Sequence, residues 1–225
     1  QQRELYEYCQ SHGIQFLSTP FDSVSLKFLT ADLRLTTIKV GSGELTNAPF
    51  LLEVAHSAEN IILSTGMSTI DEVTEAVGVI AFAMTSSTSA RPSKTSMSAA
   101  FESPEGKSAI SERVILLHCT TDYPTKPEDV NLKAMLTLGD KFKCQVGFSD
   151  HSVGVHLAVA AVAMGATIIE KHLTTSRALP GPDHKASLEP NEFKMLVSQI
   201  RELEDALGNG EKVPTEVEIQ NKKIA

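Results

Sequence analysis

Apolar residues in this chain gather in six short runs separated by stretches of helical pattern. Within each run nearly every position is apolar, rather than every second one, as expected for strands buried on both faces of a sheet. The six runs cover residues 16–21, 37–43, 61–67, 114–120, 144–150 and 167–173. The pattern therefore predicts six strands with both faces covered.

Helical periodicity fills the gaps between these runs. The clearest patterns cover residues 23–33, 49–57, 69–83 and 193–207. The third opens with Ser68 or Thr69 as a cap and Glu72 close behind, which is the signature of a capping box. The last repeats apolar residues at helical spacing and stops at Gly208, a common residue after a helix end. Alternating strands and helices predict right-handed crossovers and a parallel sheet.

A TIM-type barrel explains this arrangement better than a dinucleotide-binding fold. No Gly-x-Gly-x-x-Gly sequence follows any predicted strand, although the dinucleotide fold carries one after its first strand. We therefore expect an α/β fold, a (β/α)8 barrel over residues 1–210, whose first two strands would precede Gln1. A doubly wound open sheet is the alternative.

Two segments fall outside the strand–helix rhythm. Residues 84–110 are rich in Ser and Thr, contain two prolines and have few apolar positions, so we expect a low-complexity insertion that is disordered or loosely held. It joins a helix to the next strand, so it should emerge at the N-terminal face of the barrel, away from the chemistry. Residues 211–225 also lack periodicity and are expected to be a linker toward an absent C-terminal domain.

Composition narrows the class of protein. The chain has 225 residues, 41% of them apolar, and a net charge of −8, so no nucleic-acid partner is expected. It lacks the run of ~20 apolar residues that crosses a bilayer, and its polar amphipathic start does not resemble a signal peptide. We therefore expect no membrane partner. Three cysteines without a Cys-x-x-Cys pair fit a reducing, cytoplasmic compartment.

Ionisable side chains collect at the C-terminal ends of the predicted strands, where a barrel carries its active site. His151 and His172 end successive strands and are 21 residues apart, the length of one strand–helix–strand repeat. They should lie at the same level on adjacent strands, close enough to share one metal ion. Two imidazoles leave coordination positions open, as catalytic metal sites require. Two unrelated histidines near the rim are the alternative.

Hydroxyl groups and glycines end the other strands. Lys39, together with Ser-Gly-Glu, Ser-Thr-Gly and Phe-Ser-Asp at three strand ends, indicates a cradle for a phosphate or a carboxylate. Glu44 is the candidate general acid or base, because it follows two glycines and can lean over the barrel mouth. His118 and His156 are expected to pack within the fold rather than bind a ligand.

Six short sequences, in their order along the chain, resemble the sialic acid synthase (N-acetylneuraminate synthase) family. They are KVGSGE, ILSTGM, LHCTTDYPT followed by EDVNL, GFSDHS, EKHLT and PGPDHKASLEP. The last two and their spacing are the most specific, and the resemblance covers about residues 16–207. Family members, which include legionaminate and pseudaminate synthases, resemble a TIM barrel joined to a small antifreeze-like domain, and they form homodimers.

The resemblance implies a reaction. Phosphoenolpyruvate, an N-acetylmannosamine-type sugar and water would give a nine-carbon 2-keto acid and phosphate by C–O cleavage. A divalent metal, usually manganese, with magnesium or cobalt as alternatives, would be held by His151 and His172 and polarise the sugar aldehyde. The residues that match the phosphoenolpyruvate contacts of the family are Thr19, Lys39, Ser42, Ser64, Thr121 and Ser149. Tyr123 and Asp183 would contact the sugar, and Glu44 would handle protons or position the attacking water.

The sequence also departs from the family pattern. The first two strands and the antifreeze-like domain are absent, so this chain alone is not expected to be a complete catalyst. A class I aldolase, with Lys39 or Lys171 forming a Schiff base, is the alternative enzyme. A non-catalytic barrel fragment that binds a ligand or a partner is the alternative outside the enzymes.

Overall fold

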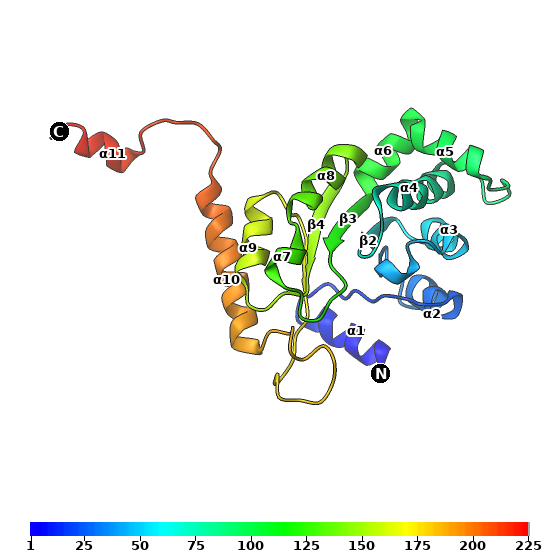
Figure 1. Ribbon diagram of the computed structural model, residues 1–225, viewed down its shortest axis with the longest axis horizontal. Coiled ribbons are helices and arrows are strands. Elements are labelled where there is room, and N and C mark those ends of the chain that lie inside the picture. The colour runs from blue at the N-terminus through cyan, green and yellow to red at the C-terminus, as the bar shows by residue number, and fades with distance from the viewer. Residues whose placement is uncertain (225) are drawn as a thin grey trace.

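Five parallel strands form one curled sheet in the computed structural model, which describes residues 1–224 (Figure 1). The strands are β1 (Thr37–Val40), β2 (Asn60–Ser64), β3 (Val114–Cys119), β4 (Gln145–Asp150) and β5 (Ile169–Lys171). Their order in the sheet is their order in the chain. A doubly wound sheet reverses its strand order at a switch point, so that alternative is wrong and the sheet is a half-barrel.

The first predicted strand, residues 16–21, is not a strand. Residues 14–20 carry no regular secondary structure, because a strand needs a neighbour to share main-chain hydrogen bonds and β1 pairs only with β2 among the described residues. The segment still lies beside β1, since a Cβ atom on Gly41 would come 3.9 Å from Cγ2 of Thr19. The other five predicted strands match β1 to β5.

Helices cover the outer face of the sheet (Figure 1). They are α2 (Ser23–Lys27), which continues as a π-helical turn (Phe28–Asp32), α3 (Ala48–Ser57), α4 (Ile70–Thr85), α7 (Pro127–Val130), α8 (Lys133–Phe142), α9 (His156–Ala163) and α10 (Pro190–Leu207). The first helix, α1 (Gln2–Ser11), contains no buried residue. The capping box predicted at the start of α4 is confirmed, with the Thr69 hydroxyl and the Glu72 carboxylate each bonded to the other's main-chain amide.

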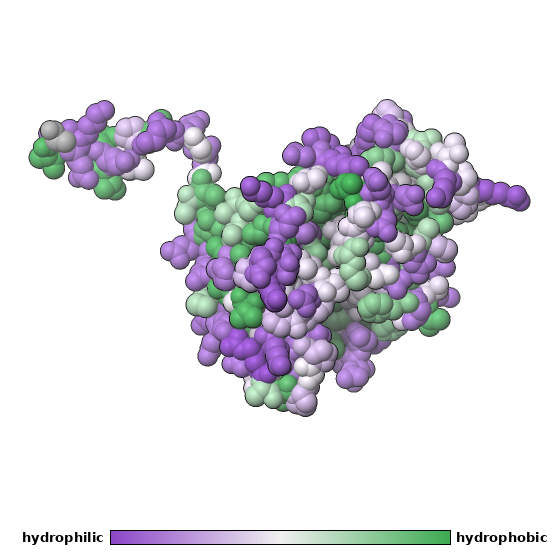
Figure 2. Space-filling view, viewed as in Figure 1, coloured by the Kyte–Doolittle hydropathy of each residue, from purple (hydrophilic) through white to green (hydrophobic). Residues whose placement is uncertain are grey.

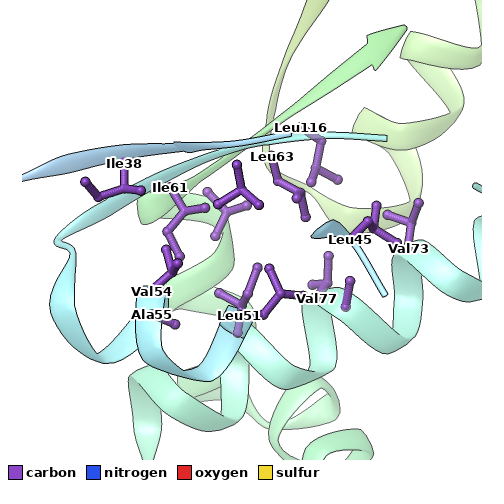
Figure 3. Packing of buried hydrophobic residues seen from close by; sticks show 14 of the residues in the cluster. Ile38, Leu45, Leu51, Val54, Ala55, Ile61, Leu63, Val73, Val77 and Leu116 are labelled. Carbon is purple, nitrogen blue, oxygen red and sulfur yellow. The ribbon is translucent and has the colours of Figure 1, made fainter. Parts of the chain in front are cut away.

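The hydrophobic core lies between the outer face of the sheet and helices α3 and α4 (Figure 3). Ile61 and Leu63 of β2 are fully buried against Leu51 and Val77 from these helices. Each such side chain contributes roughly 1.5–3 kcal/mol through burial. Because strand side chains alternate between faces, the residues between them point into the concave side of the half-barrel, where the chemistry lies.

The Ser/Thr-rich segment 84–110 is ordered, which corrects the prediction of a disordered insertion. It forms α5 (Lys94–Glu102) and leads into α6 (Pro104–Arg113), and both pack on α4. Ser93 and Ser103 accept hydrogen bonds at the two helix starts, the role in which serine favours helices. Ile110 is 1% exposed, so the few apolar residues of the segment are enough to hold it. As predicted, it enters β3 at the N-terminal edge of the sheet.

The C-terminal tail projects from the body of the molecule (Figure 1). Residues 211–224 are exposed throughout and include one short helix, α11 (Glu216–Asn221), whose visible surface is mostly hydrophilic (Figure 2). Its role as a linker stays a prediction. Among the described residues, no helix has both the length and the apolar character that spanning a membrane demands.

Candidate active site

The concave side of the sheet brings His151 and His172 together at the C-terminal edge. Ser149 of β4 pairs with Glu170 of β5 in the ladder, so the residues two positions further along each strand end meet on the same face. The two imidazole rings are 5.3 Å apart between centroids, at 82° to each other. The adjacency predicted from their spacing is therefore present, whereas their role as metal ligands stays a prediction.

The orientation of the His151 ring is fixed by the main chain. Its Nδ1 lies 2.7 Å from the carbonyl oxygen of Thr120, a contact that only a protonated nitrogen can make, so Nε2 keeps its lone pair toward the cavity. This nitrogen is 3.3 Å from Oγ of Ser149. Burial lowers the pKa of His151, which favours the neutral form that binds metals.

Asp183 reaches His172 from the long loop after β5. Its Oδ2 lies 3.8 Å from Nδ1 of His172. The loop folds back on itself because Thr174 Oγ1 contacts Nδ1 of His184 at 2.8 Å and Leu173 pairs with Leu188. The Asp183 side chain remains 53% exposed, so it is free to contact a ligand at the rim.

Tyr123 packs against both histidines. Its ring centroid is 4.2 Å from that of His151 and 5.5 Å from that of His172. Burial is the main cause that raises the pKa of Tyr123, so its phenol stays protonated near neutral pH and can donate a hydrogen bond. Tyr123, predicted to contact the sugar, thus lies in one cluster with the two imidazoles, and Asp183 lies at the edge of that cluster.

Lys39 lies at the centre of a second group of polar side chains, in which Lys39, Ser64 and Ser149 are buried and the side chain of Glu170 is 40% exposed. Its Nζ donates to Oγ of Ser64 at 2.8 Å and lies 3.4 Å from Oε2 of Glu170. Oγ of Ser149 donates to the other carboxylate oxygen of Glu170 at 2.6 Å. Glu170 thus joins the predicted anion-binding residues to one another. Sequence reasoning did not select it, although its two-residue offset from His172 places it on the same face.

The remaining predicted anion-binding residues surround this group. Thr19 lines a cavity of about 220 Å³ together with Lys39 and Glu170. Ser42 and Thr121 meet over Gly66, where a Cβ atom would lie 2.7 Å from Oγ1 of Thr121 and 3.2 Å from Oγ of Ser42. Only glycine fits there, and the absence of its side chain lets the two hydroxyl groups approach.

Glu44 follows β1 at the C-terminal edge of the sheet, and its role as general acid or base stays a prediction. It lies in a short 3-10 turn (Ser42–Glu44) after β1, and its carboxylate accepts a hydrogen bond from the Asn47 amide at 2.7 Å. Within residues 1–224 it makes no ion pair with the cluster. Among the described residues, no hydrogen bond or ion pair joins Glu44 to either histidine.

Other polar groups near the strand ends have structural partners. Nζ of Lys171 lies 2.8 Å from Oδ2 of Asp150, with both side chains at most 1% exposed, which disfavours a Schiff base at Lys171. His118 bonds to the Val130 carbonyl and stacks on Phe148, so the expectation that it packs in the fold is confirmed. His156, by contrast, is exposed at the start of α9, so the expectation of packing was wrong there.

The donor set fits an open metal site. The described residues contain no group of three or more His, Cys, Asp or Glu side chains arranged to hold a metal ion. His151 and His172 would therefore supply only part of a ligand set and would leave positions for water and substrate. The main-chain bond at Nδ1 of His151 is the second contact that metal-binding histidines commonly make.

Comparisons with known proteins agree on one family. The NeuB family model matches residues 1–212. The chain is 43% identical over 222 residues to the N,N'-diacetyllegionaminic acid synthase of Campylobacter jejuni, covering 99% of this chain and 59% of that protein. It is 32% identical to the N-acetylneuraminate-9-phosphate synthase of Homo sapiens, over 99% of this chain and 55% of that protein. The chain thus spans little more than half the length of these curated relatives.

A solved structure also matches the fold. The N-acetylneuraminic acid synthetase of Leptospira borgpetersenii, crystallised with citrate, superposes with a TM-score of 0.77 at 32% identity. The match covers 100% of this chain and 70% of that one. The curled sheet and its helical cover therefore correspond to a large part of that fold.

Proposed function

The chain belongs to the NeuB family of sialic acid synthases, and we propose that the protein of which it is part condenses phosphoenolpyruvate with an N-acetylmannosamine-type hexosamine. The products would be a nine-carbon 2-keto acid and phosphate. The observation that carries the proposal is the meeting of two imidazoles with a Lys39–Glu170–Ser149 network at one edge of the sheet. We further propose that the protein is cytoplasmic and that it forms a homodimer.

The Lys39–Glu170–Ser149 network suits the anionic substrate. Lys39 is 8% exposed, so its ammonium group acts where water screens charge weakly. Together with the hydroxyl groups of Ser64 and Ser149, it can donate charge-assisted hydrogen bonds to the carboxylate or phosphate of phosphoenolpyruvate. Thr19, Ser42 and Thr121 lie around this group and would hold the remaining oxygens.

The histidine side suits the sugar. Asp183 can accept a hydrogen bond from a sugar hydroxyl, and the Tyr123 phenol can donate one. A divalent cation, manganese being our first choice, held by His151 and His172 would supply a Lewis acid for the aldehyde of the open-chain sugar. These residues together would orient the aldehyde carbon toward the alkene carbon of phosphoenolpyruvate, which is the geometry that carbon–carbon bond formation requires.

A carboxylate must handle protons when water adds to the enol carbon. Glu170 contacts both Lys39 and Ser149, whereas Glu44 bonds to Asn47 outside the cluster. We therefore assign the positioning of this water to Glu170 first and to Glu44 second.

A product assay of the full-length protein tests the proposal. Phosphoenolpyruvate should be tested with N-acetylmannosamine, its 6-phosphate and a diacetamido hexose. The last is included because the identity to the legionaminic acid synthase exceeds that to the neuraminate-9-phosphate synthase. We expect one hexosamine to give a 2-keto acid and stoichiometric phosphate, and a chelator to stop both. No product with any sugar would overturn the proposal, and borohydride trapping of a keto acid on Lys39 would favour an aldolase.

A further inference from the structure

A buried ion pair lies on the outer face of the two strands that carry the histidines. Asp150 and Lys171 immediately precede His151 and His172, and their side chains are 0% and 1% exposed. Alternation along the strands sends this pair to the helix-covered side of the sheet, while the histidines face the cavity. The pair and the imidazoles therefore share the same two strand ends but do not share a surface.

The pair is part of a closed network. Oδ1 of Asp150 accepts from the main-chain amide and the hydroxyl of Ser152, at 2.8 and 2.6 Å. Lys171 donates to Oδ2 of Asp150 at 2.8 Å and also to the carbonyl of Ser152. Among the described residues, no buried side-chain nitrogen or oxygen lacks a partner. The network thus encloses the main chain of His151 between Asp150 and Ser152.

Stability alone does not explain a buried ion pair at this position. Removing two charges from water costs about as much as their attraction returns, and apolar pairs of similar size are often as stable. The preceding outward-facing residues of β4, Val146 and Phe148, are apolar and buried, so an apolar pair would suit this face equally well. Unlike an apolar contact, the ion pair joins the ends of β4 and β5 in a fixed direction.

The link lies where the main-chain ladder ends. The last pair between β4 and β5 is Asp150 with Lys171. Beyond it, His151 is held from the side of β3, because its carbonyl accepts from the Thr125 amide at 3.0 Å. His172 is held from the other side, where its carbonyl accepts from the Leu188 amide at 2.9 Å. Each histidine is thus fixed to a different neighbour.

We propose that the Asp150–Lys171 ion pair is a positioning device that sets the separation and orientation of His151 and His172, so that both imidazoles can bind one divalent cation. This proposal rests on the proposed function only in that a divalent cation binds to His151 and His172. Neither Asp150 nor Lys171 touches the substrate, so both act through the histidines.

The test compares variants of the full-length protein that remove or keep the pair. A single Lys171→Met variant would leave a buried, unpaired carboxylate and could fail to fold. The variant Asp150→Asn, Lys171→Met removes both charges and keeps an oxygen for the Ser152 bonds. Lys171→Arg keeps the charge. The melting temperature of the metal-free protein, the Mn²⁺ affinity from the free-ion electron paramagnetic resonance signal, and the Co²⁺ absorption spectrum would be measured for each.

We expect the double variant to melt within a few degrees of the wild type, but to bind Mn²⁺ about tenfold or more weakly, which is about 1.4 kcal/mol, and to alter the Co²⁺ spectrum. Lys171→Arg should restore most of the Mn²⁺ affinity. Arg113→Met is the matched control, because this cation bonds to the carbonyls of Glu59 and Ala58 at the opposite edge of the sheet. It should lower the melting temperature and leave Mn²⁺ affinity unchanged.

Two results would overturn the positioning role. One is unchanged Mn²⁺ affinity in the double variant, whatever happens to its melting temperature. The other is a wild-type protein that binds no Mn²⁺. Failure of the proposed function is recognised separately, as a wild-type protein that binds Mn²⁺ yet releases no phosphate with any hexosamine.

Discussion

Two regions of this molecule are rich in Ser, Thr, Lys and Glu, and they use these residues in opposite ways. At the C-terminal edge of the sheet, polar side chains bond to partners far away in the sequence. Lys39 bonds to Ser64 across 25 positions and Ser149 to Glu170 across 21. In α5 and α6, the hydrogen bonds of these residues join close neighbours, such as Ser93 with Ser96 and Lys107 with Glu102, and the ion pair of Lys94 with Glu75 of α4 is the longer contact.

This difference in the sequence distance between bonded partners distinguishes the candidate site from the helices α5 and α6, which cover the sheet. Short-range bonds cap helices and satisfy local main-chain groups, so they stabilise the element that contains them. Bonds between distant strands gather groups that the chain could not otherwise hold together, and they leave lone pairs and protons facing a cavity. Polar composition is similar in both regions, whereas the sequence distance between partners differs.

The largest effect is expected when both histidines of the long-range polar region, His151 and His172, are removed. The full-length His151→Ala, His172→Ala variant should lose metal-dependent turnover, with kcat/KM falling about a thousandfold or more, or about 4 kcal/mol. Both donors of the proposed cation site are then absent. The metal-dependent turnover is measured as phosphate release from phosphoenolpyruvate in the presence of the hexosamine, with and without added Mn²⁺. His156→Ala, which truncates an exposed histidine on α9, should be unchanged. Metal-dependent activity that survives in the double variant would disprove the assignment.

A smaller loss is expected at the anion-binding side. Lys39→Met should lower kcat/KM for phosphoenolpyruvate about a hundredfold, because it removes charge-assisted bonds, of which each is worth roughly 1.5–3 kcal/mol. Initial rates at varied phosphoenolpyruvate and saturating sugar measure the effect. Lys27→Met, at an exposed lysine of α2, is the control. If both variants behave alike, Lys39 is a structural residue rather than a binding one.

Asp183→Asn should act on the other substrate. Loss of one charged acceptor at the sugar hydroxyl should reduce kcat/KM for the hexosamine by about ten- to a hundredfold. The KM for phosphoenolpyruvate should change little, since Asp183 lies on the histidine side of the site, 3.8 Å from Nδ1 of His172. The affinity for Mn²⁺ should also change little, because the substitution removes neither imidazole. Equal losses for both substrates, with a lower melting temperature, would indicate that Asp183 only shapes its turn.

Much of the site at the C-terminal edge of the sheet could be predicted, because the spacing of the strands and the alternation of side chains along them follow from geometry. The 21-residue separation of His151 and His172 was enough to place them on neighbouring strands. Glu170 was overlooked because the run Glu-Lys-His does not say which residues face inward, although the offset from His172 would have shown it. The role of Glu44 stays a prediction, because two preceding glycines give the main chain freedom but do not fix the direction of the side chain.

Within the helical cover, residues 84–110 were mispredicted for a different reason, whereas the helical patterns at 23–33, 49–57, 69–83 and 193–207 correspond to α2, α3, α4 and α10. Average composition made residues 84–110 resemble a disordered segment, yet the local signals of helix starts were present. Ser103 is followed by Pro104, the pair that begins α6, and proline at this position is typical of a first helical turn. The missing strand at residues 16–21 could not have been foreseen from its own pattern, since pairing depends on a neighbour.

The smallest effect on activity is expected in the cover, where Phe101→Ala should separate stability from function. Phe101 is partly buried in α5 and lies 6.0 Å from Phe142 between ring centroids. Its truncation should lower the free energy of unfolding by roughly 2 kcal/mol, about half the cost in a full core. Turnover should stay within about threefold, or ~0.7 kcal/mol, because α5 packs on α4 in the outer helical layer and its side-chain hydrogen bonds are local. Denaturant unfolding and initial rates on the same preparation measure the two quantities. A hundredfold loss of kcat/KM at temperatures where the variant is folded would mean that the cover communicates with the site, and the contrast between short-range and long-range bonds would no longer separate the two regions.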